Sequence, residues 1–363
     1  MEITRPTVLE VNLDNLNYNI NQIQNYIGGE VKIMPVIKAN GYGTYINKRL
    51  DILNQFDIVA VATVDEAVEI RKIGYEKEIF VLNQPDVAEI QKILENNIVV
   101  GASSRMFIDE LAKTKKHVKI HLEIGTGMGR TGINPYKVKA FMDNFPDNIK
   151  IDGAYTHLSS ADSDDEYTKK QLTSFNIAVS ELKEIIGDLK YVHSAASNAI
   201  LNYPESHFNL VRPGIILYGY PACDTTLSKI KLKPITKLKS KITYLKTVKE
   251  GTSIGYNRSY ITKRETKVAT VPIGYADGFR RVFSNGWEVL INGKKVPIIG
   301  KVCMDGFMCD VTELKDVKLD DEVIIWDNEN ISVEELAKKC DTINYEILST
   351  IGARVPRKFI KKQ

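Results

Sequence analysis

Two alternating patterns of apolar positions run from residue 31 to residue 212. Short apolar runs rich in β-branched residues are typical of buried strands, and the stretches between them place apolar residues three and four apart, as amphipathic helices do. The predicted strands are residues 31–37, 58–62, 79–82, 98–100, 118–124, 151–156, 191–193 and 208–210. The predicted helices are residues 65–72, 86–95, 103–113, 136–144 and 166–186, preceded by a helix that begins at Asp14 and stops at Gly28-Gly29. Alternation of this kind, with eight buried strands of parallel type, predicts an α/β fold, a (β/α)8 TIM barrel.

The pattern changes near residue 230. Short β-rich runs follow at residues 236–248, 267–272, 287–291, 296–299 and 322–326, with turn pairs such as Asn285-Gly286 and Asn292-Gly293 between them, and only residues 333–339 suggest a helix. We therefore expect residues 1–230 to form the barrel and residues 231–363 a mostly β C-terminal domain. A short strand is predicted at residues 8–11, and the first ~10 residues are candidates for pairing with the β domain.

Composition narrows the class of protein. The chain is 43% hydrophobic and 26% charged, with a formal net charge of +3 and both signs interspersed, which argues against a nucleic-acid or membrane partner. Residues 1–6 are charged and lack an apolar core, so we expect no secretory signal. Four cysteines without zinc-ligand spacing and only five histidines predict reduced thiols, a cytoplasmic location and no metal site.

Lys38 is the first candidate for chemistry. It ends a buried strand and precedes a loop with a glycine on each side of Tyr42. Barrels carry their chemistry at the carboxyl ends of the strands, and partial burial there would lower the pKa of the amine and make it a candidate Schiff-base former. The alternative, that Lys38 simply ends a strand and extends to water, fits the local pattern equally well.

Further polar residues follow the later predicted strands. They are Arg130, His157, Ser197 and Arg212. Together with Lys38 they place an amine, two guanidinium groups, an imidazole and a hydroxyl at one rim, without a pair of carboxylates or a set of metal ligands. Such a rim, with a phosphate pocket after the last two strands, suits a phosphorylated aldehyde cofactor.

Six motifs in order resemble the alanine racemase family, pyridoxal-phosphate enzymes with an N-terminal barrel and a C-terminal β domain. They are residues 38–43 (KANGYG), 127–132 (GMGRTG), 156–157 (TH), 212–215 (RPGI), 274–278 (GYADG) and 303–305 (CMD). Each motif is short and weak alone, whereas their joint occurrence across essentially the whole chain is specific.

The resemblance implies a catalytic pair. Lys38 would hold pyridoxal 5'-phosphate and act as one acid–base group, and Tyr275 would be the second, on the opposite face of the substrate. Removing a Cα proton from one side and returning it to the other is simplest with two such groups. His157, Arg212 and Asp305 are implied as supporting residues. Arg212 would donate to the pyridine nitrogen without protonating it, which weakens the ring as an electron sink and suppresses transamination.

The resemblance also implies binding residues and a partner. Tyr42, Ser197, Gly214 and Ile215, together with Lys38 and Arg212, are similar to the cofactor contacts. Arg130 and the backbone around Met304 are similar to the groups that receive the substrate carboxylate. In the family, the residues matching Tyr275 and Met304 come from the partner subunit, so a homodimer with shared active sites is implied.

Each of these residues has an ordinary structural explanation when taken singly. Tyr275 in a glycine-rich turn could pin a loop, His157 could be a buried histidine with its hydrogen bonds satisfied, and Arg212 could pair with an acid. Met128 and Met304 are common packing residues.

Several positions depart from the family. Glu123 stands where many members have a carbamylated lysine that orients the arginine matching Arg130, and its carboxylate could supply that anion directly. Ala196 replaces an asparagine, Ala353 replaces a tyrosine that narrows the entrance, and Thr44 replaces a histidine. A methyl group in place of an aromatic ring leaves space, so these positions bear on substrate choice.

The predicted function is therefore racemisation of alanine, which supplies D-alanine for peptidoglycan. The alternatives are a serine racemase, a broad-specificity racemase that includes lysine and arginine, and, more remotely, a pyridoxal-phosphate-dependent decarboxylase on the same two-domain plan. A single-barrel cofactor carrier is disfavoured because the chain continues for more than a hundred residues after the barrel.

Overall fold

The computed structural model describes residues 4–361 and divides the chain into two compact units. The barrel unit comprises Asn17–Gly41 and Tyr45–Lys233, and the β unit comprises the described residues up to Leu16, Tyr42–Thr44 and the chain from Pro234 onward. Each unit has its own sheet.

Eight parallel strands form the barrel. They are β2 (Lys32–Ile33), β3 (Ile58–Val61), β4 (Glu78–Val81), β5 (Val99–Ala102), β6 (Val118–Glu123), β7 (Ile149–Tyr155), β8 (Tyr191–His193) and β9 (Leu210–Val211). Strands β3 to β8 pair in chain order, and β2 pairs with β9. Single parallel bridges, Val36 to Ala60 and Ala196 to Arg212, join the two sheets on either side and close the ring. The predicted fold class is confirmed.

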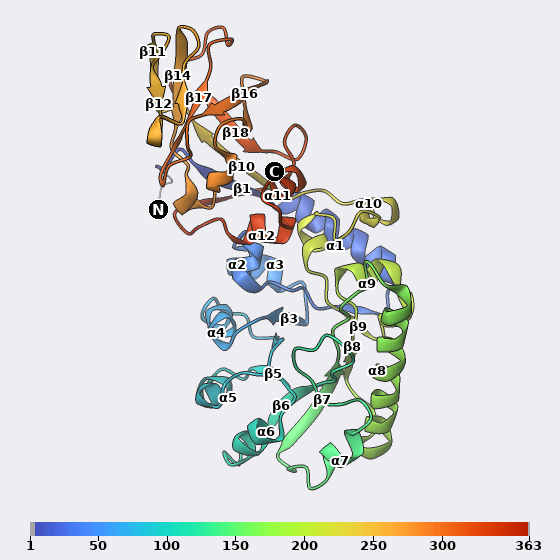
Figure 1. Cartoon of the computed structure of the whole chain (residues 1–363). Coiled ribbons are helices and arrows are strands. Elements are labelled where there is room, and N and C mark those ends of the chain that lie inside the picture. The colour runs from blue at the N-terminus through green and yellow to red at the C-terminus, as the bar shows by residue number, and fades with distance from the viewer. Residues whose placement is uncertain (1–3, 362–363) are drawn as a thin grey trace. The chain divides into compact units, whose positions relative to one another are not determined.

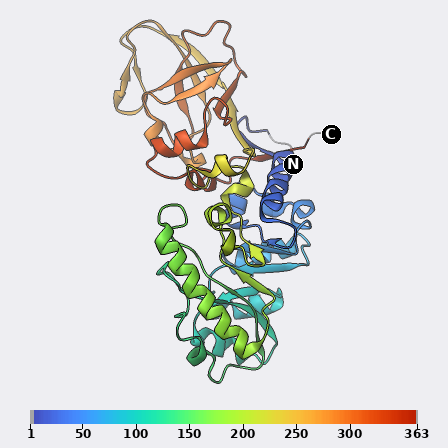
Figure 2. The same ribbon diagram turned by 90° about the vertical axis from the view of Figure 1, so that its right-hand side faces the viewer.

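Helices cover the outside of the barrel strands, as Figure 1 shows for α4, α5, α6 and α8. The helices in and around this unit are α1 (Leu13–Ile27), α2 (Lys38–Tyr42), α3 (Leu50–Leu53), α4 (Val64–Lys72), α5 (Ile90–Glu95), α6 (Arg105–Ala112), α7 (Val138–Met142), α8 (Asp165–Ile186), α9 (Ser197–Asn202) and α10 (Thr226–Lys229). The long helix α8 begins where the Asp164 side chain accepts the Tyr167 N–H and ends at Gly187, whose φ is 81°. Figure 2 shows α8 along the flank of the barrel.

Aromatic rings and imidazoles fill the barrel interior. Phe80 stacks on His121 with centroids 4.4 Å apart, Tyr155 stacks on His193 at 5.2 Å, and His121 Nδ1 lies 2.9 Å from His193 Nε2. Gly101 makes room for this cluster, since a Cβ there would lie 2.2 Å from the Tyr155 hydroxyl. The interior therefore holds polar groups that must be matched to one another.

A nine-stranded, mostly antiparallel sheet forms the β unit, in the order β11-β14-β17-β16-β15-β18-β10-β1-β19. Its strands are β1 (Val8–Asn12), β10 (Thr236–Lys241), β11 (Tyr244–Val248), β14 (Thr266–Val271), β15 (Glu288–Ile291), β16 (Lys294–Ile299), β17 (Phe307–Asp310), β18 (Glu322–Trp326) and β19 (Arg357–Ile360), and β12 (Ser253–Ile254) pairs with β13 (Tyr260–Ile261) beside them. Two helices, α11 (Val333–Lys339) and α12 (Asn344–Ser349), complete the unit.

The structure corrects several predicted elements. The run at residues 236–248 is two strands, interrupted at residues 242–243. The break is hidden in the sequence because Ile242 is buried and continues the apolar pattern. Strand β10 pairs with β1 and β18, whereas β11 pairs with β14. Strands β17 and β19 and helix α12 were not predicted, since four to six residues carry too little periodicity. The predicted hairpin at Asn292-Gly293 joins β15 to β16.

The histidine pair in the barrel predicts a dependence of stability on pH. Burial lowers the pKa of His121 to about 3, whereas an unfolded histidine titrates near ~6.5. The unfolded state therefore binds more protons below that value, and the free energy of unfolding falls as pH drops from about 6.5 toward about 3, at up to ~1.4 kcal/mol per pH unit for each such histidine.

We expect His121→Gln to show a shallower loss of stability between about pH 7 and about pH 5 in urea unfolding. The matched control is His117→Gln, whose side chain is exposed. Equal slopes for the two variants would contradict this prediction.

Candidate active site

Lys38 opens a left-handed turn at the barrel rim. Ala39, Asn40 and Gly41 have φ values of 52°, 54° and 61°, and the Gly41 N–H donates to the Ile37 carbonyl at 2.9 Å. The left-handed region costs a non-glycine residue about 1–2 kcal/mol. Surrounding contacts must offset that cost, and strained backbone of this kind is concentrated at functional sites.

The Lys38 amine is partly buried. Burial lowers its pKa most, and the cationic side chains of Arg130 and Arg212 lower it further, while the Glu66 carboxylate raises it. The net effect is downward, so the amine gives up its proton more easily than an exposed lysine does. A neutral amine is the form that attacks a carbonyl carbon.

Arg212 is buried, with 2% of its surface exposed. Its NH1 donates to His193 Nδ1 at 2.8 Å and to the His193 carbonyl at 2.9 Å, and its NH2 donates to the carbonyls of Thr156 at 2.8 Å and Ser194 at 3.0 Å. Burial lowers the pKa of Arg212 to about 10, so it remains a cation near neutral pH. All the hydrogen bonds that Arg212 makes within the described chain come from NH1 and NH2.

The guanidinium determines the tautomers of the imidazoles around it. Because Arg212 only donates, His193 Nδ1 accepts, so the His193 proton sits on Nε2 and faces His121 Nδ1. His157 Nδ1 lies 3.5 Å from Arg212 NH2. Burial, followed by the charges of Arg212 and Arg130, lowers the pKa of His157 to about 3. His157 is therefore a neutral imidazole that accepts at Nδ1.

Ser197, Gly214 and Ile215 meet where two short helical segments begin. Ser197 starts α9 directly after Ala196, and Ile215 starts the 3-10 helix η4 (Ile215–Tyr218). The Gly214 N–H donates to Ser197 Oγ at 3.0 Å. The first N–H groups of a helix have no acceptor within it, so this junction presents donors of the kind that a phosphate accepts.

Glu123 is buried at the end of β6. Its Oε1 accepts from the Thr131 hydroxyl at 2.7 Å, and its Oε2 is buried without a hydrogen-bond partner in the described chain. Burial, and then the Glu123 charge, raise the pKa of Tyr155. Arg130 is exposed and forms no ion pair with Glu123 among the described residues. The acid therefore faces Thr131 and Tyr155.

Two loops of the β unit carry Tyr275 and Met304 together. The Tyr275 N–H donates to the Cys303 carbonyl at 3.1 Å, and the Ala276 N–H donates to the Met304 carbonyl at 3.0 Å. The loops touch at Gly274, where a Cβ would lie 2.3 Å from the Cys303 oxygen. Tyr275 and Met304 remain 44% and 51% exposed, so both side chains project from one rigid surface.

A buried carboxylate holds this surface. Asp277 is fully buried, and its Oδ2 accepts the Gly274 N–H at 3.0 Å. Its Oδ1 lies 2.8 Å from Arg5 NH1 and 3.2 Å from Arg354 Nε. Arg354 also pairs with Asp305 at 2.7 Å, so the predicted supporting residue Asp305 belongs to this network.

The other predicted residues of the β unit lie on neighbouring segments. The Gly352 N–H donates to the Asp277 carbonyl at 3.1 Å, which brings exposed Ala353 next to the Tyr275 turn. Tyr42 is buried, with its ring 6.0 Å from that of Tyr345. Thr44 is fully buried.

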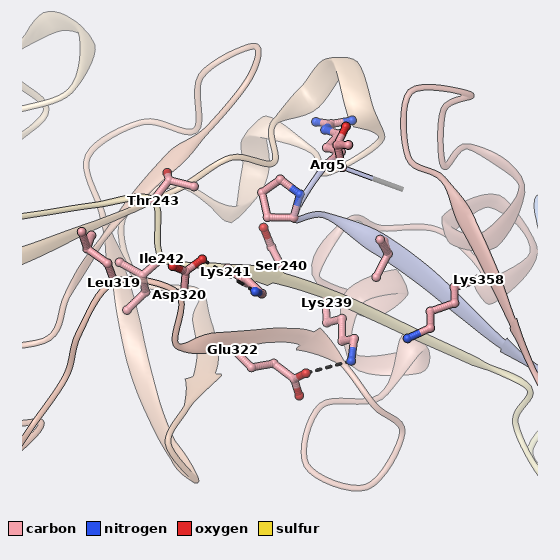
Figure 3. Close-up of a pocket in the computed structure, with 13 residues that line it drawn as sticks. Arg5, Lys239, Ser240, Lys241, Ile242, Thr243, Leu319, Asp320, Glu322 and Lys358 are labelled. Carbon is pink, nitrogen blue, oxygen red and sulfur yellow. Dashed lines mark hydrogen bonds and ion pairs between the residues drawn. The ribbon is translucent and has the colours of Figure 1, made fainter. Parts of the chain in front are cut away.

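Two hollows open on the β unit. One, of about 530 Å³, is lined by Tyr256, Tyr275, Arg281 and Val302. The other, of about 840 Å³, lies along β10, and Figure 3 shows its charged side chains. Lys239 pairs there with Glu322 at 2.8 Å, and Lys241 lies 3.6 Å from Asp320. This second hollow contains none of the predicted site residues, and these lysines are already neutralised.

Sequence reasoning missed four residues that the structure joins to the site. They are Glu66, which bonds the turn after Lys38, and Arg5, Asp277 and Arg354, which hold the Tyr275 loop. The spacing Thr63-x-x-Glu66 was a readable helix-start signal. Nothing in the sequence pairs Arg5 with residues more than 260 positions away.

Within residues 4–361, no cluster of histidine, cysteine or acidic residues has the arrangement of a metal site. Across the same residues, no helix is both long enough and apolar enough to span a bilayer.

Comparison with known proteins shows the family. Residues 11–222 match the model of the alanine racemase N-terminal domain, and residues 235–359 match that of the C-terminal domain. Curated alanine racemases from Halothermothrix orenii and Methanococcus maripaludis are 39% and 38% identical to this chain; each alignment covers 99% of it, with 98% and 100% of the respective relative.

Solved structures agree as well. The alanine racemase of Clostridium difficile 630 is 35% identical with a TM-score of 0.94, covering 99% of this chain and 97% of that one. The Bacillus anthracis alanine racemase with bound L-Ala-P is 36% identical with a TM-score of 0.93, covering 99% and 96%. The chain belongs to the alanine racemase family.

Proposed function

We propose that this protein is a pyridoxal-phosphate-dependent racemase that interconverts L- and D-alanine. The observation that carries the proposal is a partly buried amine of lowered pKa, Lys38, within reach of the charge of a buried guanidinium, Arg212, in a chain of this family. We further assign it to the cytoplasm, with D-alanine for peptidoglycan as its product.

The donors of the barrel unit fit the cofactor. Lys38 would hold its aldehyde carbon, the junction of Ser197, Gly214 and Ile215 would receive its phosphate, and Arg212 would donate from Nε to its ring nitrogen. When bound, pyridoxal 5'-phosphate supplies a conjugated ring that withdraws electrons from the substrate Cα. By the family resemblance, Tyr42 would be a further phosphate contact.

Arg212 limits how strongly that ring withdraws electrons. Its NH1 and NH2 groups are committed to fixed acceptors in the barrel, and its cationic form has no proton to give up near neutral pH. Arg212 would therefore donate a hydrogen bond to the ring nitrogen of the bound cofactor without giving it a proton. This favours simple return of the Cα proton over transamination.

Two groups move that proton. Lys38 accepts or returns it on one face of the substrate, and Tyr275 of the partner subunit does so on the other. The exposure of Tyr275 and Met304 on one rigid surface of the β unit supports their use by a second chain. Arg130 and the Met304 backbone would receive the carboxylate, so the protein would act as a homodimer with shared sites.

Residues 1–230 are proposed as the cofactor-binding part and residues 231–363 as the part that supplies Tyr275 to the partner. Ala196, Ala353 and Thr44 are the positions proposed to set substrate size, since all three are smaller than the family's usual residues. Activity is therefore to be compared on alanine, serine, lysine and arginine.

Complementation between two inactive variants tests the function and the shared site together. Lys38→Ala and Tyr275→Phe should each lose almost all racemisation of alanine, measured by optical rotation. Refolded together in equal amounts, they should recover about a quarter of wild-type activity, because half the dimers are mixed and each mixed dimer has one intact site.

Borohydride reduction of the wild type, followed by mass analysis, should trap the cofactor on Lys38 and on no other lysine. Absence of cofactor from Lys38 would overturn the proposal, and absence of recovery in the mixture would place both groups in one chain.

Glu123 is proposed to act as the buried anion of the substrate pocket. Glu123→Gln removes the charge while keeping an acceptor for Thr131, and a charge-assisted hydrogen bond is worth ~1.5–3 kcal/mol, so we expect kcat/KM for alanine to fall about tenfold or more. The matched control is the exposed Glu166→Gln. Unchanged kinetics in Glu123→Gln would make the residue an ordinary strand-end acid.

A further inference from the structure

The Glu66 carboxylate connects the start of α4 to the turn that follows Lys38. Its Oε1 accepts the Ala39 N–H at 2.6 Å. Its Oε2 accepts the N–H groups of Ala62 at 2.8 Å and Thr63 at 3.3 Å. One side chain thus receives three backbone donors from two separate segments of the barrel unit.

This arrangement exceeds what a helix start requires. A capping box needs one acidic or amide side chain to accept the N–H of its own N-cap residue. The box formed by Ser332 and Glu335 at α11 does this, with the Ser332 N–H donating to Glu335 Oε2 at 2.7 Å. Glu335 bonds no residue outside its own helix start in the described chain, whereas Glu66 also reaches 27 positions back.

The hydrogen bond from the Ala39 N–H to Glu66 stabilises a strained part of the backbone. Ala39 and Asn40 are non-glycine residues in the left-handed region, and Ala39 directly follows Lys38. A turn of that kind keeps its conformation only when contacts with the surrounding structure offset its cost. The direction of the Lys38 side chain depends on this turn. Before Lys38, the Ile37 N–H donates to the Ala60 carbonyl of β3 at 2.9 Å, and after it the Ala39 N–H donates to Glu66.

The charge of Glu66 acts on the same lysine. Among the groups that shift the pKa of Lys38, Glu66 is the one that raises it, against burial, Arg130 and Arg212. Removing the carboxylate would lower that pKa, so the amine would become neutral at a lower pH.

We propose that Glu66 is a positioning residue for Lys38: its carboxylate fastens the left-handed turn to α4 and so fixes where the amine meets the cofactor. The proposal rests on the function proposed above, in which Lys38 carries pyridoxal 5'-phosphate.

The test compares Glu66→Gln with the matched variant Glu335→Gln. Both lose the carboxylate of a capping box, so a purely structural role predicts similar small losses of thermal stability and nothing more. The amide of Glu66→Gln retains one acceptor oxygen and cannot serve both Ala39 and Ala62.

Two readouts separate positioning from capping. The first is the rate at which cofactor-free protein captures added pyridoxal 5'-phosphate on Lys38, followed by its visible absorption as a function of pH. The second is kcat and KM for alanine in the holoenzyme. We expect Glu66→Gln to capture the cofactor several-fold more slowly, with the pH midpoint moved downward, and to lose about tenfold in kcat. Glu335→Gln should match the wild type in both readouts.

Equal capture rate, midpoint and kcat in the two variants would overturn the proposal. If Glu66→Gln does not fold, Glu66→Asp, which keeps the charge but lacks the reach to Ala39, is compared with Glu335→Asp, and slow capture in Glu66→Asp alone supports positioning. Failure of the wild type to capture the cofactor on Lys38 would instead overturn the proposed function, so the two failures are distinguishable.

Discussion

The burial of one guanidinium organises the barrel rim. Arg212 lies almost wholly out of solvent, and a charge in that position is tolerable only if its donors are matched. The carbonyls of Thr156, His193 and Ser194 provide that match, together with the His193 imidazole. Strands β7 and β8 thus end next to the guanidinium, and Arg212 itself directly follows β9. A single requirement of electrostatics therefore fixes the ends of three strands.

The same cation sets the protonation of its surroundings. As a pure donor it makes acceptors of His193 and His157, and its charge contributes to the low pKa of His157 and to that of Lys38. The Glu66 carboxylate opposes the effect of Arg212 on the pKa of Lys38, and the buried carboxylate of Glu123 raises the pKa of Arg212. The rim is thus a set of cations and neutral imidazoles with two separated carboxylates. Such a set suits an anionic, phosphorylated ligand better than a metal ion.

In the β unit, close packing and ion pairs hold the loops that carry Tyr275 and Met304. Its two motif loops approach so closely that only glycine fits at residue 274, and buried Asp277 forms ion pairs with two arginines from opposite ends of the chain. The side chains that remain outside, Tyr275 and Met304, are held by backbone hydrogen bonds. A side chain that acts on a site outside its own unit must be exposed, and its backbone must be held in a fixed position.

Periodicity and short motifs determined a large part of this protein. The eight barrel strands, the main helices between them, the β-rich C-terminal region and family membership followed from the sequence, because a repeated apolar pattern and six ordered motifs are local signals. The short elements β17, β19 and α12 did not follow, since their pairing partners decide whether such segments are ordered at all. The predicted roles of Lys38, Tyr275 and Glu123 remain predictions.

Only the tertiary structure decided which polar groups meet. It brought Arg5 and Arg354 into ion pairs with Asp277. It placed the Glu123 carboxylate against the Thr131 hydroxyl, without an ion pair to Arg130 in the described chain. It also bonded Glu66 to the turn after Lys38. These contacts join residues far apart in the chain, so no local pattern records them. The strength of these hydrogen bonds and ion pairs depends on how far they are buried, and burial exists only in the folded chain.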